Sequence, residues 1–271
     1  MNWPGIPFLM YHAIRGENGS GEADPRYTVA LAEFERQLAY LHEAGFQTIS
    51  LAQFLDWHRH GDSLPSNPIV LTFDDGDPSH FELVLPRLKQ HGFRAAFSVV
   101  PSWIGTPRSF SVEQLRALQA AGMEIMSHGM HHIPLTDLPL PKLRQELLAS
   151  RIQLEAWLKR PVLALAIPRG FSNVRVRKAI NESGYQVVCT SRPRHNHRSS
   201  DRYTLGRIPI RAHVRLDDFI GLVQGHTGQH ARELSSYWVR HSAQRLLGPK
   251  RYDRLRGFLL RPRRKGVIRH A

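Results

Sequence analysis

Two adjacent carboxylates follow an apolar run in the first third of the chain. Asp74 and Asp75 come directly after Ile-Val-Leu-Thr-Phe at 69–73 and are followed by Gly76. Two like charges at the end of a buried strand repel each other, and a cation beside them removes that cost. Neighbouring strand residues point to opposite sides, so one Asp can bind a metal while the other faces elsewhere. Asp-Gly is also a common turn pair, and the motif alone fits a turn equally well.

A pair of histidines follows a second apolar run. His128 comes directly after 123–127, and His132 stands four residues later, so that one helical turn would bring both imidazoles to the same face. Two His and one Asp form a three-ligand set that leaves a fourth zinc position open for water, as in catalytic zinc sites. His131 is an alternative ligand that ranks below His132. Chance His pairs are plentiful among 16 His, but both motifs stand at predicted strand ends, which argues against chance.

The rest of the chain alternates short apolar runs with longer amphipathic ones, as strands and helices do. The predicted strands cover 7–11, 46–50, 69–73, 94–100, 123–127, 162–167 and 185–190. The predicted helices cover 31–43, 51–60, 81–91, 111–122, 141–158 and 174–183. This alternation predicts parallel strands joined by right-handed crossovers in one α/β domain. The nearly all-apolar strands favour a closed or nearly closed barrel over an open sheet, with reactive groups at the carboxyl ends of the strands.

The two motifs resemble those of a known family. Thr-Phe-Asp-Asp-Gly at 72–76, with Ser-His-x-x-x-His at 127–132, is similar to the polysaccharide deacetylases with a NodB-homology domain, carbohydrate esterase family four. Further segments match in order at 7–12, 34–46 and 166–170. A Tyr-His strand ahead of the Asp-Asp motif resembles the branch that acts on poly-N-acetylglucosamine. The resemblance extends from about residue 6 to 211 and implies a deformed (β/α) barrel.

The resemblance also implies a role for each motif residue. Asp75, His128 and His132 would hold a divalent metal, usually zinc, which lowers the pKa of a water molecule and polarises the amide carbonyl. Asp74 would be the general base that takes a proton from that water.

Two further segments complete the implied machinery. By the resemblance, His12, in the Tyr-His strand, would be the acid that protonates the departing amine; without the family, strand-end packing is the favoured explanation of this residue. Pro168 and Arg169 match the oxyanion segment, where the backbone N–H of Arg169 would donate to the developing negative charge.

Four positions depart from the family pattern. Asp77 stands where an aromatic residue is usual and Arg169 where Tyr is usual, while His131 replaces a small residue and Ile133 a Pro. None of these departures removes a metal ligand or the general base, so they affect the identity of the substrate more than the activity. A cationic Arg169 favours a substrate that carries phosphate or carboxylate.

A second set of acids and histidines imitates the first one. Asp217 and Asp218 precede an apolar run, where acids favour a helix N-terminus through its dipole. His226 and His230 enclose a glycine in a polar stretch, which weakens the helix that would align them. We therefore interpret this set as structural. His195, among several arginines, is interpreted as part of a solvated loop.

Basic residues gather at the C-terminal end. The chain of 271 residues is 41% hydrophobic and 22% charged, as in globular proteins, with 37 Lys+Arg against 23 Asp+Glu and a net charge of +14. Residues 250–271 contain nine Lys or Arg and one acid, and so carry +8 of that total. This tail is either a solvated end or an attachment to an anionic membrane surface, to which each basic residue contributes about 1 kcal/mol.

The location and organisation follow from the same features. No run approaches the roughly 18 apolar residues of a membrane span, and no basic n-region of a signal peptide is visible. The single cysteine cannot form an internal disulfide. We expect a protein that is cytoplasmic or peripheral at the inner membrane surface. It would have a NodB-like catalytic domain over 1–211 and a C-terminal extension over 212–271 that is helical and then strongly basic.

The predicted function is a metal-dependent hydrolase that removes N-acetyl groups from amino sugars in a polysaccharide or oligosaccharide by metal-activated water. One alternative is a deacylase or deformylase of a lipid-linked sugar at the inner membrane surface. Another is a catalytically silent carbohydrate- or nucleic-acid-binding protein. Nucleic acid is not favoured as a partner, because no recognised nucleic-acid-binding motif accompanies the basic tail.

Overall fold

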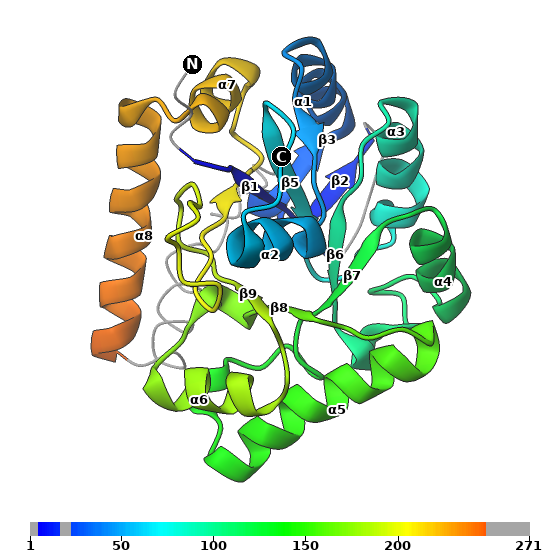
Figure 1. Ribbon diagram of the computed structural model, residues 1–271, viewed down its shortest axis with the longest axis vertical. Coiled ribbons are helices and arrows are strands. Elements are labelled where there is room, and N and C mark those ends of the chain that lie inside the picture. The colour runs from blue at the N-terminus through cyan, green and yellow to red at the C-terminus, as the bar shows by residue number, and fades with distance from the viewer. Residues whose placement is uncertain (1–4, 17–22, 248–271) are drawn as a thin grey trace, which may run out of the picture.

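A curled sheet of parallel strands forms the centre of the molecule (Figure 1). The computed structural model describes residues 5–16 and 23–247. The strand order is β10-β1-β5-β6-β7-β8-β9, with β4 paired to β5, and all these pairs are parallel. The strands are β1 (Phe8–Tyr11), β4 (Gln47–Thr48), β5 (Pro68–Phe73), β6 (Ala96–Val99), β7 (Glu124–Ser127), β8 (Ala164–Ala166), β9 (Val187–Cys189) and β10 (Ile208–Pro209). A separate pair joins β2 (Ala13–Arg15) to β3 (Thr28–Ala30).

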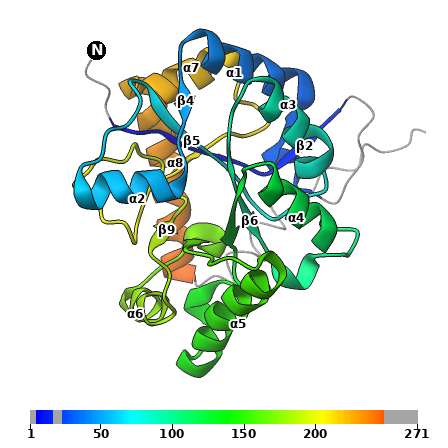
Figure 2. The same cartoon turned by 45° about the vertical axis from the view of Figure 1, so that its right-hand side comes forward.

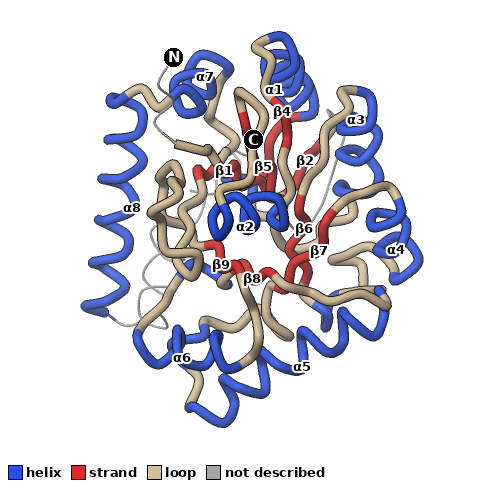
Figure 3. Tube along the Cα trace, in the orientation of Figure 1, coloured by secondary structure: helices blue, strands red, loops and turns tan. Residues whose placement is uncertain are grey.

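Helices surround this sheet (Figures 1 and 3). They are α1 (Leu31–Glu43), α2 (Leu51–His60), α3 (Leu85–Gln90), α4 (Val112–Ala120), α5 (Leu140–Leu158), α6 (Val174–Glu182), α7 (Leu216–Gln224) and α8 (Thr227–Leu247). Local sequence explains several of their ends. Ser50 and Ser111 each cap a helix through a capping box, and Gly61 ends α2 in the left-handed conformation at φ 82°.

The sheet curls into an incomplete barrel, in agreement with the deformed (β/α) barrel that the sequence predicts. Its edge strands β9 and β10 are joined through the segment that precedes β10. Leu205 N–H donates to the Val188 carbonyl at 2.9 Å, and Thr190 N–H donates to the Leu205 carbonyl at 2.8 Å. The barrel is therefore nearly closed on this side.

Strand residues alternate between two apolar layers. One layer, between the strands and the outer helices, includes Leu71 and Phe73 of β5. The other layer contains Val70 of the same strand together with Phe54 of α2, both buried. Helix α2 therefore packs into the barrel. The first N–H groups of α2, those of Leu51 and Ala52, donate to the Glu124 carboxylate at the amino end of β7. The amino end of the barrel is covered, which leaves the carboxyl ends of the strands for chemistry.

Two local predictions need correction. The segment predicted as one helix over 81–91 begins with a turn of π-helix at His80–Val84, and only Leu85–Gln90 is α-helical. Residues 128–132 form a loop rather than a helical turn, with Gly129 at φ 73° and His132 at φ 57°.

Two helices follow the last strand. Helix α7 buries Phe219, Leu222 and Val223 in the main core, whereas α8 packs mostly beside it. The division at residue 211 stays a prediction, and the basic tail at 250–271 lies outside the described residues. Among the described helices, none is both long enough and apolar enough to cross a bilayer.

Candidate active site

Strands β5 and β7, which lie on either side of β6, deliver the two predicted motifs to one end of the barrel. Asp74 N–H donates to the Tyr11 carbonyl at the end of β1, and His128 N–H donates to the Val99 carbonyl at the end of β6, both at 2.9 Å. These bonds extend the parallel ladders just past β5 and β7. The two motifs therefore lie at the carboxyl ends of β5 and β7, the end of the barrel where parallel α/β folds place their reactive groups.

Asp75, His128 and His132 converge on one point. Asp75 Oδ1 lies 3.4 Å from His128 Nε2 and 3.4 Å from His132 Nε2, and one ligand atom from each residue lies within 4.8 Å of the others. The left-handed backbone at His132, not a helix, turns its ring toward His128. Within the described part of the chain, no other group of three or more such residues can hold a metal ion.

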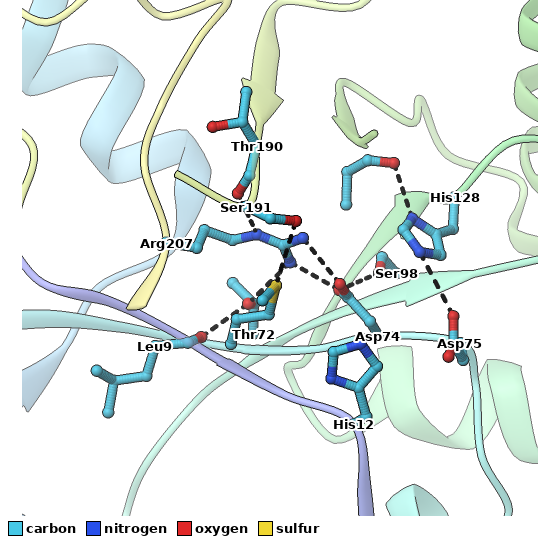
Figure 4. Close-up of polar contacts among 12 residues, drawn as sticks. Leu9, His12, Thr72, Asp74, Asp75, Ser98, His128, Thr190, Ser191 and Arg207 are labelled. Atoms are coloured by element: carbon cyan, nitrogen blue, oxygen red, sulfur yellow. Dashed lines mark hydrogen bonds and ion pairs between the residues drawn. The ribbon is translucent and has the colours of Figure 1, made fainter. Parts of the chain in front are cut away.

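The donor set of these three residues fits a divalent cation. His128 Nδ1 donates to the Ala166 carbonyl at 2.8 Å, which leaves the lone pair of Nε2 facing Asp75 (Figure 4). Asp75 Oδ1 is buried yet makes no hydrogen bond. Burial and the neighbouring His128 lower the pKa of His132 to about 4, so its imidazole is neutral at physiological pH. A buried carboxylate oxygen without a donor, between two imidazole nitrogens, suits a cation.

Asp74 points away from Asp75 and is held by Arg207 (Figure 4). Arg207 Nη1 donates to Asp74 Oδ1 at 2.7 Å and Nη2 donates to Oδ2 at 2.8 Å, while Ser98 Oγ also donates to Oδ1. Arg207 is fully buried. Burial alone would raise the pKa of Asp74, but the adjacent guanidinium outweighs it and holds that pKa well below its usual range.

Arg207 was not identified from the sequence. It stands 133 residues after Asp74, and no local motif links the two. The available signal was a lone Arg in the apolar stretch Leu-Gly-Arg-Ile-Pro-Ile at 205–210. An arginine buried in such a strand needs an anion or several acceptors, and Thr190 and Thr72 supply the remaining ones at 3.1 Å each.

His12 lies beside Asp74, between β1 and β2 (Figure 4). Its ring packs on Tyr27 with centroids 4.8 Å apart, and its Nδ1 is buried without a hydrogen bond. The fully buried His80 donates from Nε2 to the His12 carbonyl at 2.7 Å. The sequence did not indicate that His80 holds the His12 backbone.

The residues that depart from the family pattern have defined positions. Asp77 accepts two hydrogen bonds from Arg15, both at 2.7 Å, which ties β2 to the Asp-Asp-Gly turn. His131 turns to Glu146, whose carboxylate accepts from the ring at 2.8 Å and from the backbone N–H at 2.6 Å. Its ring is therefore outside the three-residue group.

The oxyanion segment forms a tight turn at the end of β8. Pro168, Arg169 and Gly170 make one 3-10 turn, with Arg169 at φ 60°. A Cβ on Gly170 would lie 2.7 Å from Ser191 Oγ and 2.9 Å from its backbone nitrogen. Only glycine fits this close approach. The Arg169 side chain is exposed at the carboxyl end of the barrel.

The second acid and histidine set does not form a comparable site in the described residues. Asp217 and Asp218 stand in the first turn of α7, as the structural interpretation requires, and the His230 side chain lies outside the described residues. The interpretation of His195 as part of a solvated loop was wrong. It is buried, and its Nε2 bonds the Leu222 carbonyl at 3.0 Å because α7 packs over this loop.

Comparisons with known proteins agree with this arrangement. Residues 61–188 match the family model described as polysaccharide deacetylase. The chain is 28% identical over 206 residues to a putative polysaccharide deacetylase, YxkH, of Bacillus subtilis, covering 76% of this chain and 71% of that protein. It is 36% identical over 114 residues to the poly-beta-1,6-N-acetyl-D-glucosamine N-deacetylase of Escherichia coli K12, but spans only 16% of that protein's length and 41% of its own.

Solved structures show the same fold. The Streptococcus pyogenes deacetylase PplD superposes with a TM-score of 0.75 at 21% identity, over 82% of this chain and 99% of that one. IcaB from Ammonifex degensii superposes with a TM-score of 0.70 at 23% identity, over 81% and 96%. Over residues 61–188 the chain matches the polysaccharide deacetylase family, and a relative of the same description aligns with 76% of the chain. Polysaccharide deacetylases are hydrolases that cleave the amide bond of N-acetylated sugars.

Proposed function

We propose that this protein is a metal-dependent N-deacetylase of amino sugars in a polysaccharide or oligosaccharide. The observation that carries the proposal is the buried Asp75 Oδ1, which makes no hydrogen bond and lies 3.4 Å from an imidazole nitrogen of both His128 and His132. Next to it, Asp74 is held ionised by Arg207. A cation site adjacent to an oriented base is what amide hydrolysis requires.

Asp75, His128 and His132 would hold the metal. When bound, a divalent cation such as zinc supplies a Lewis acid that polarises the scissile carbonyl and acidifies water. His128 is pre-oriented by the Ala166 carbonyl, and the ring of His132 lies between Trp103 and His128, with centroids 5.1 and 4.9 Å away. Such supporting contacts fix ligand orientation.

Asp74 acts as the general base in this mechanism. Arg207 and Ser98 fix the plane of its carboxylate, while Oδ2 accepts one hydrogen bond from the described residues, from Arg207. A second lone pair on Oδ2 thus remains to take the proton of the attacking water. The strongly lowered pKa means that Asp74 is ionised before the reaction begins.

His12 acts as the acid. Water adds to the acetyl carbon, the C–N bond breaks, and the nitrogen needs a proton before it leaves as an amine. His80 holds the His12 backbone, and Tyr27 supports its ring, so that the imidazole stays beside Asp74. Pro168 sets the turn that would present the backbone N–H of Arg169 to the carbonyl oxygen as negative charge develops there.

The test compares two site variants with an exposed control. In the full chain, Asp74→Asn should keep the metal but reduce acetate release from N-acetylglucosamine oligomers by about 10³-fold, as loss of a general base does. His128→Ala should lose both metal and activity. His226→Ala, an exposed histidine outside the site, should change neither.

Elemental analysis and acetate release are measured on the same preparations. A chelator should remove activity, and added zinc should restore it. Turnover retained by Asp74→Asn, or by a protein shown to be metal-free, would contradict the mechanism.

Arg169 is the proposed determinant of substrate charge. Its side chain is exposed at the carboxyl end of the barrel, and its charge acts on His132, so a phosphate or carboxylate on the sugar would be attracted there. Arg169→Tyr should raise KM for an anionic N-acetylated sugar more than for a neutral one. An unchanged ratio of kcat/KM between the two substrates would exclude this role.

A further inference from the structure

Helix α8 is long but barely buried. It runs for 21 residues, and among its described side chains only Glu233 is buried. By contrast, the 19 residues of α5 bury six side chains. A helix of this length gains most of its stability from packing one face on another surface. Helix α8 therefore presents a face that the rest of the described protein does not cover.

Helix α8 lies along the side of the molecule, next to α7 (Figures 1 and 2), and two side-chain contacts attach it to the barrel. Arg211, just after β10, donates to both carboxylate oxygens of Glu233 at 2.8 and 2.7 Å, and both side chains are buried. Arg192, just after β9, lies over the Trp238 ring, 5.6 Å from its centroid. Both arginines follow the carboxyl ends of strands, on the segments that flank Arg207. The helix is therefore attached to segments that follow strand carboxyl ends, the end of the barrel that carries the candidate active site.

The exposed residues of α8 define what we term the α8 outer face. They recur at helical spacing: Ala231, Arg232, Ser235, Trp238, Val239 and Ser242. Trp238 is 48% exposed and Val239 is 70% exposed. Glu233 is the only acid of α8, and Arg211 already neutralises it. The face thus combines an exposed Trp–Val pair with the positive charge of Arg232.

The chain continues from the end of α8 with more positive charge. Residues 248–271, outside the described part of the chain, follow Leu247 directly and contain nine Lys or Arg and one Asp. A helix with exposed tryptophan and aliphatic side chains, followed in sequence by many cations, is typical of segments that bind the interface of an anionic bilayer.

We infer that the α8 outer face docks on an anionic lipid surface, which would hold the candidate active site next to the membrane. A second copy of the chain fits less well, because two apolar side chains flanked by serines fall far short of the roughly 1,000 Å² of a stable interface. Nucleic acid would be attracted by the charge but would gain little from an exposed Val239. The inference does not depend on which amide the enzyme hydrolyses.

The experiment measures binding of the full chain to phosphatidylglycerol–phosphatidylcholine vesicles and to pure phosphatidylcholine vesicles by co-sedimentation. Binding should require phosphatidylglycerol and weaken with salt. The double variant Trp238→Ser with Val239→Ser should bind about tenfold more weakly, because it loses the apolar area that would enter the interface. The matched control Val174→Ser removes an 85% exposed side chain at the start of α6 and should bind like the unmodified chain.

Because Trp238→Ser also removes the Arg192 contact, Val239→Ser alone, which keeps that contact, is measured beside the double variant. Val239→Ser and Val174→Ser should unfold at the same temperature as the unmodified chain, and Val239→Ser should still bind the anionic vesicles more weakly. Equal vesicle binding by the double variant and the control would overturn the proposal, as would binding to pure phosphatidylcholine alone. Tighter Trp238-dependent binding to an oligonucleotide would assign the face to nucleic acid. A dimer in sedimentation velocity that the double variant dissolves would assign it to a second copy.

Discussion

The two ends of the barrel each use a carboxylate at a strand terminus, but in opposite electrostatic environments. At the carboxyl end, Asp74 meets the guanidinium of Arg207, and its pKa lies well below the usual range although burial acts in the other direction. At the amino end, Glu124 accepts from the N–H groups of Leu51 and Ala52 at 2.6 and 3.3 Å. Burial raises the pKa of Glu124, because these two N–H groups and a more distant Arg94 offset only part of its desolvation.

The opposite pKa shifts of Asp74 and Glu124 show what keeps a buried carboxylate ionised. Backbone N–H groups at a helix start can satisfy a carboxylate, and in return Glu124 caps α2, which covers the amino end of the barrel. At Asp74 a full positive charge in direct contact outweighs the desolvation of the carboxylate, whereas at Glu124 two N–H groups do not. Asp74 therefore has a charge ready for proton transfer, whereas Glu124 serves the fold.

Removing the cation at the catalytic end should have the largest effect. Arg207→Met leaves Asp74 as an unpaired buried charge, and we expect a loss of about 3–5 kcal/mol in the free energy of unfolding, measured by urea denaturation. Activity should fall by roughly 10²-fold or more, because the base is no longer positioned.

The double variant Asp74→Asn with Arg207→Met sharpens this test. With both charges removed, much of the lost stability should return, while activity should not. A double variant as unstable as Arg207→Met alone would mean that packing rather than charge explains the effect.

The corresponding change at the amino end should be smaller and should not affect catalysis. Glu124→Ala leaves the first N–H groups of α2 without their carboxylate acceptor, which should cost about 1–2 kcal/mol of unfolding free energy, as the loss of a helix cap does. The kcat and KM for an N-acetylated sugar should stay unchanged. A change in kcat would show that the two ends are coupled.

The smallest effect concerns pH. Because the pKa of Glu124 is raised in the folded state, the folded protein takes up this proton before the unfolded chain does as the pH falls. Relative to Glu124→Gln, the unmodified protein should gain stability as the pH falls through this raised pKa to the ordinary value of 4.5. Asp74 contributes in the opposite direction, and its stabilisation is lost only below its ordinary value of 3.8. Urea denaturation of both proteins over this range measures the difference.

Much of the fold follows from local sequence patterns. The spacing of Phe34, Leu38 and Leu41 predicts the helix that the structure places at Leu31–Glu43, and the apolar run at 69–73 predicts β5. Such patterns are readable because a helix or strand imposes its period on the residues that face the core. The hydrophobic residues of the short strand β4 and of the π-helix before α3 show a weaker periodic pattern, and there the predicted bounds differ from the structure.

The sequence by itself determined which residues are the candidates for the chemistry, since Asp-Asp-Gly and the two histidines each follow an apolar strand. Tertiary structure decided how they are used. The left-handed backbone at His132 brings the imidazoles together without a helix, and Arg207 reaches Asp74 across 133 residues of chain. The physical reason is that periodicity records only which face of an element is buried. Which charges meet across the barrel depends on strand order and curvature, and these arise from the packing of the whole chain.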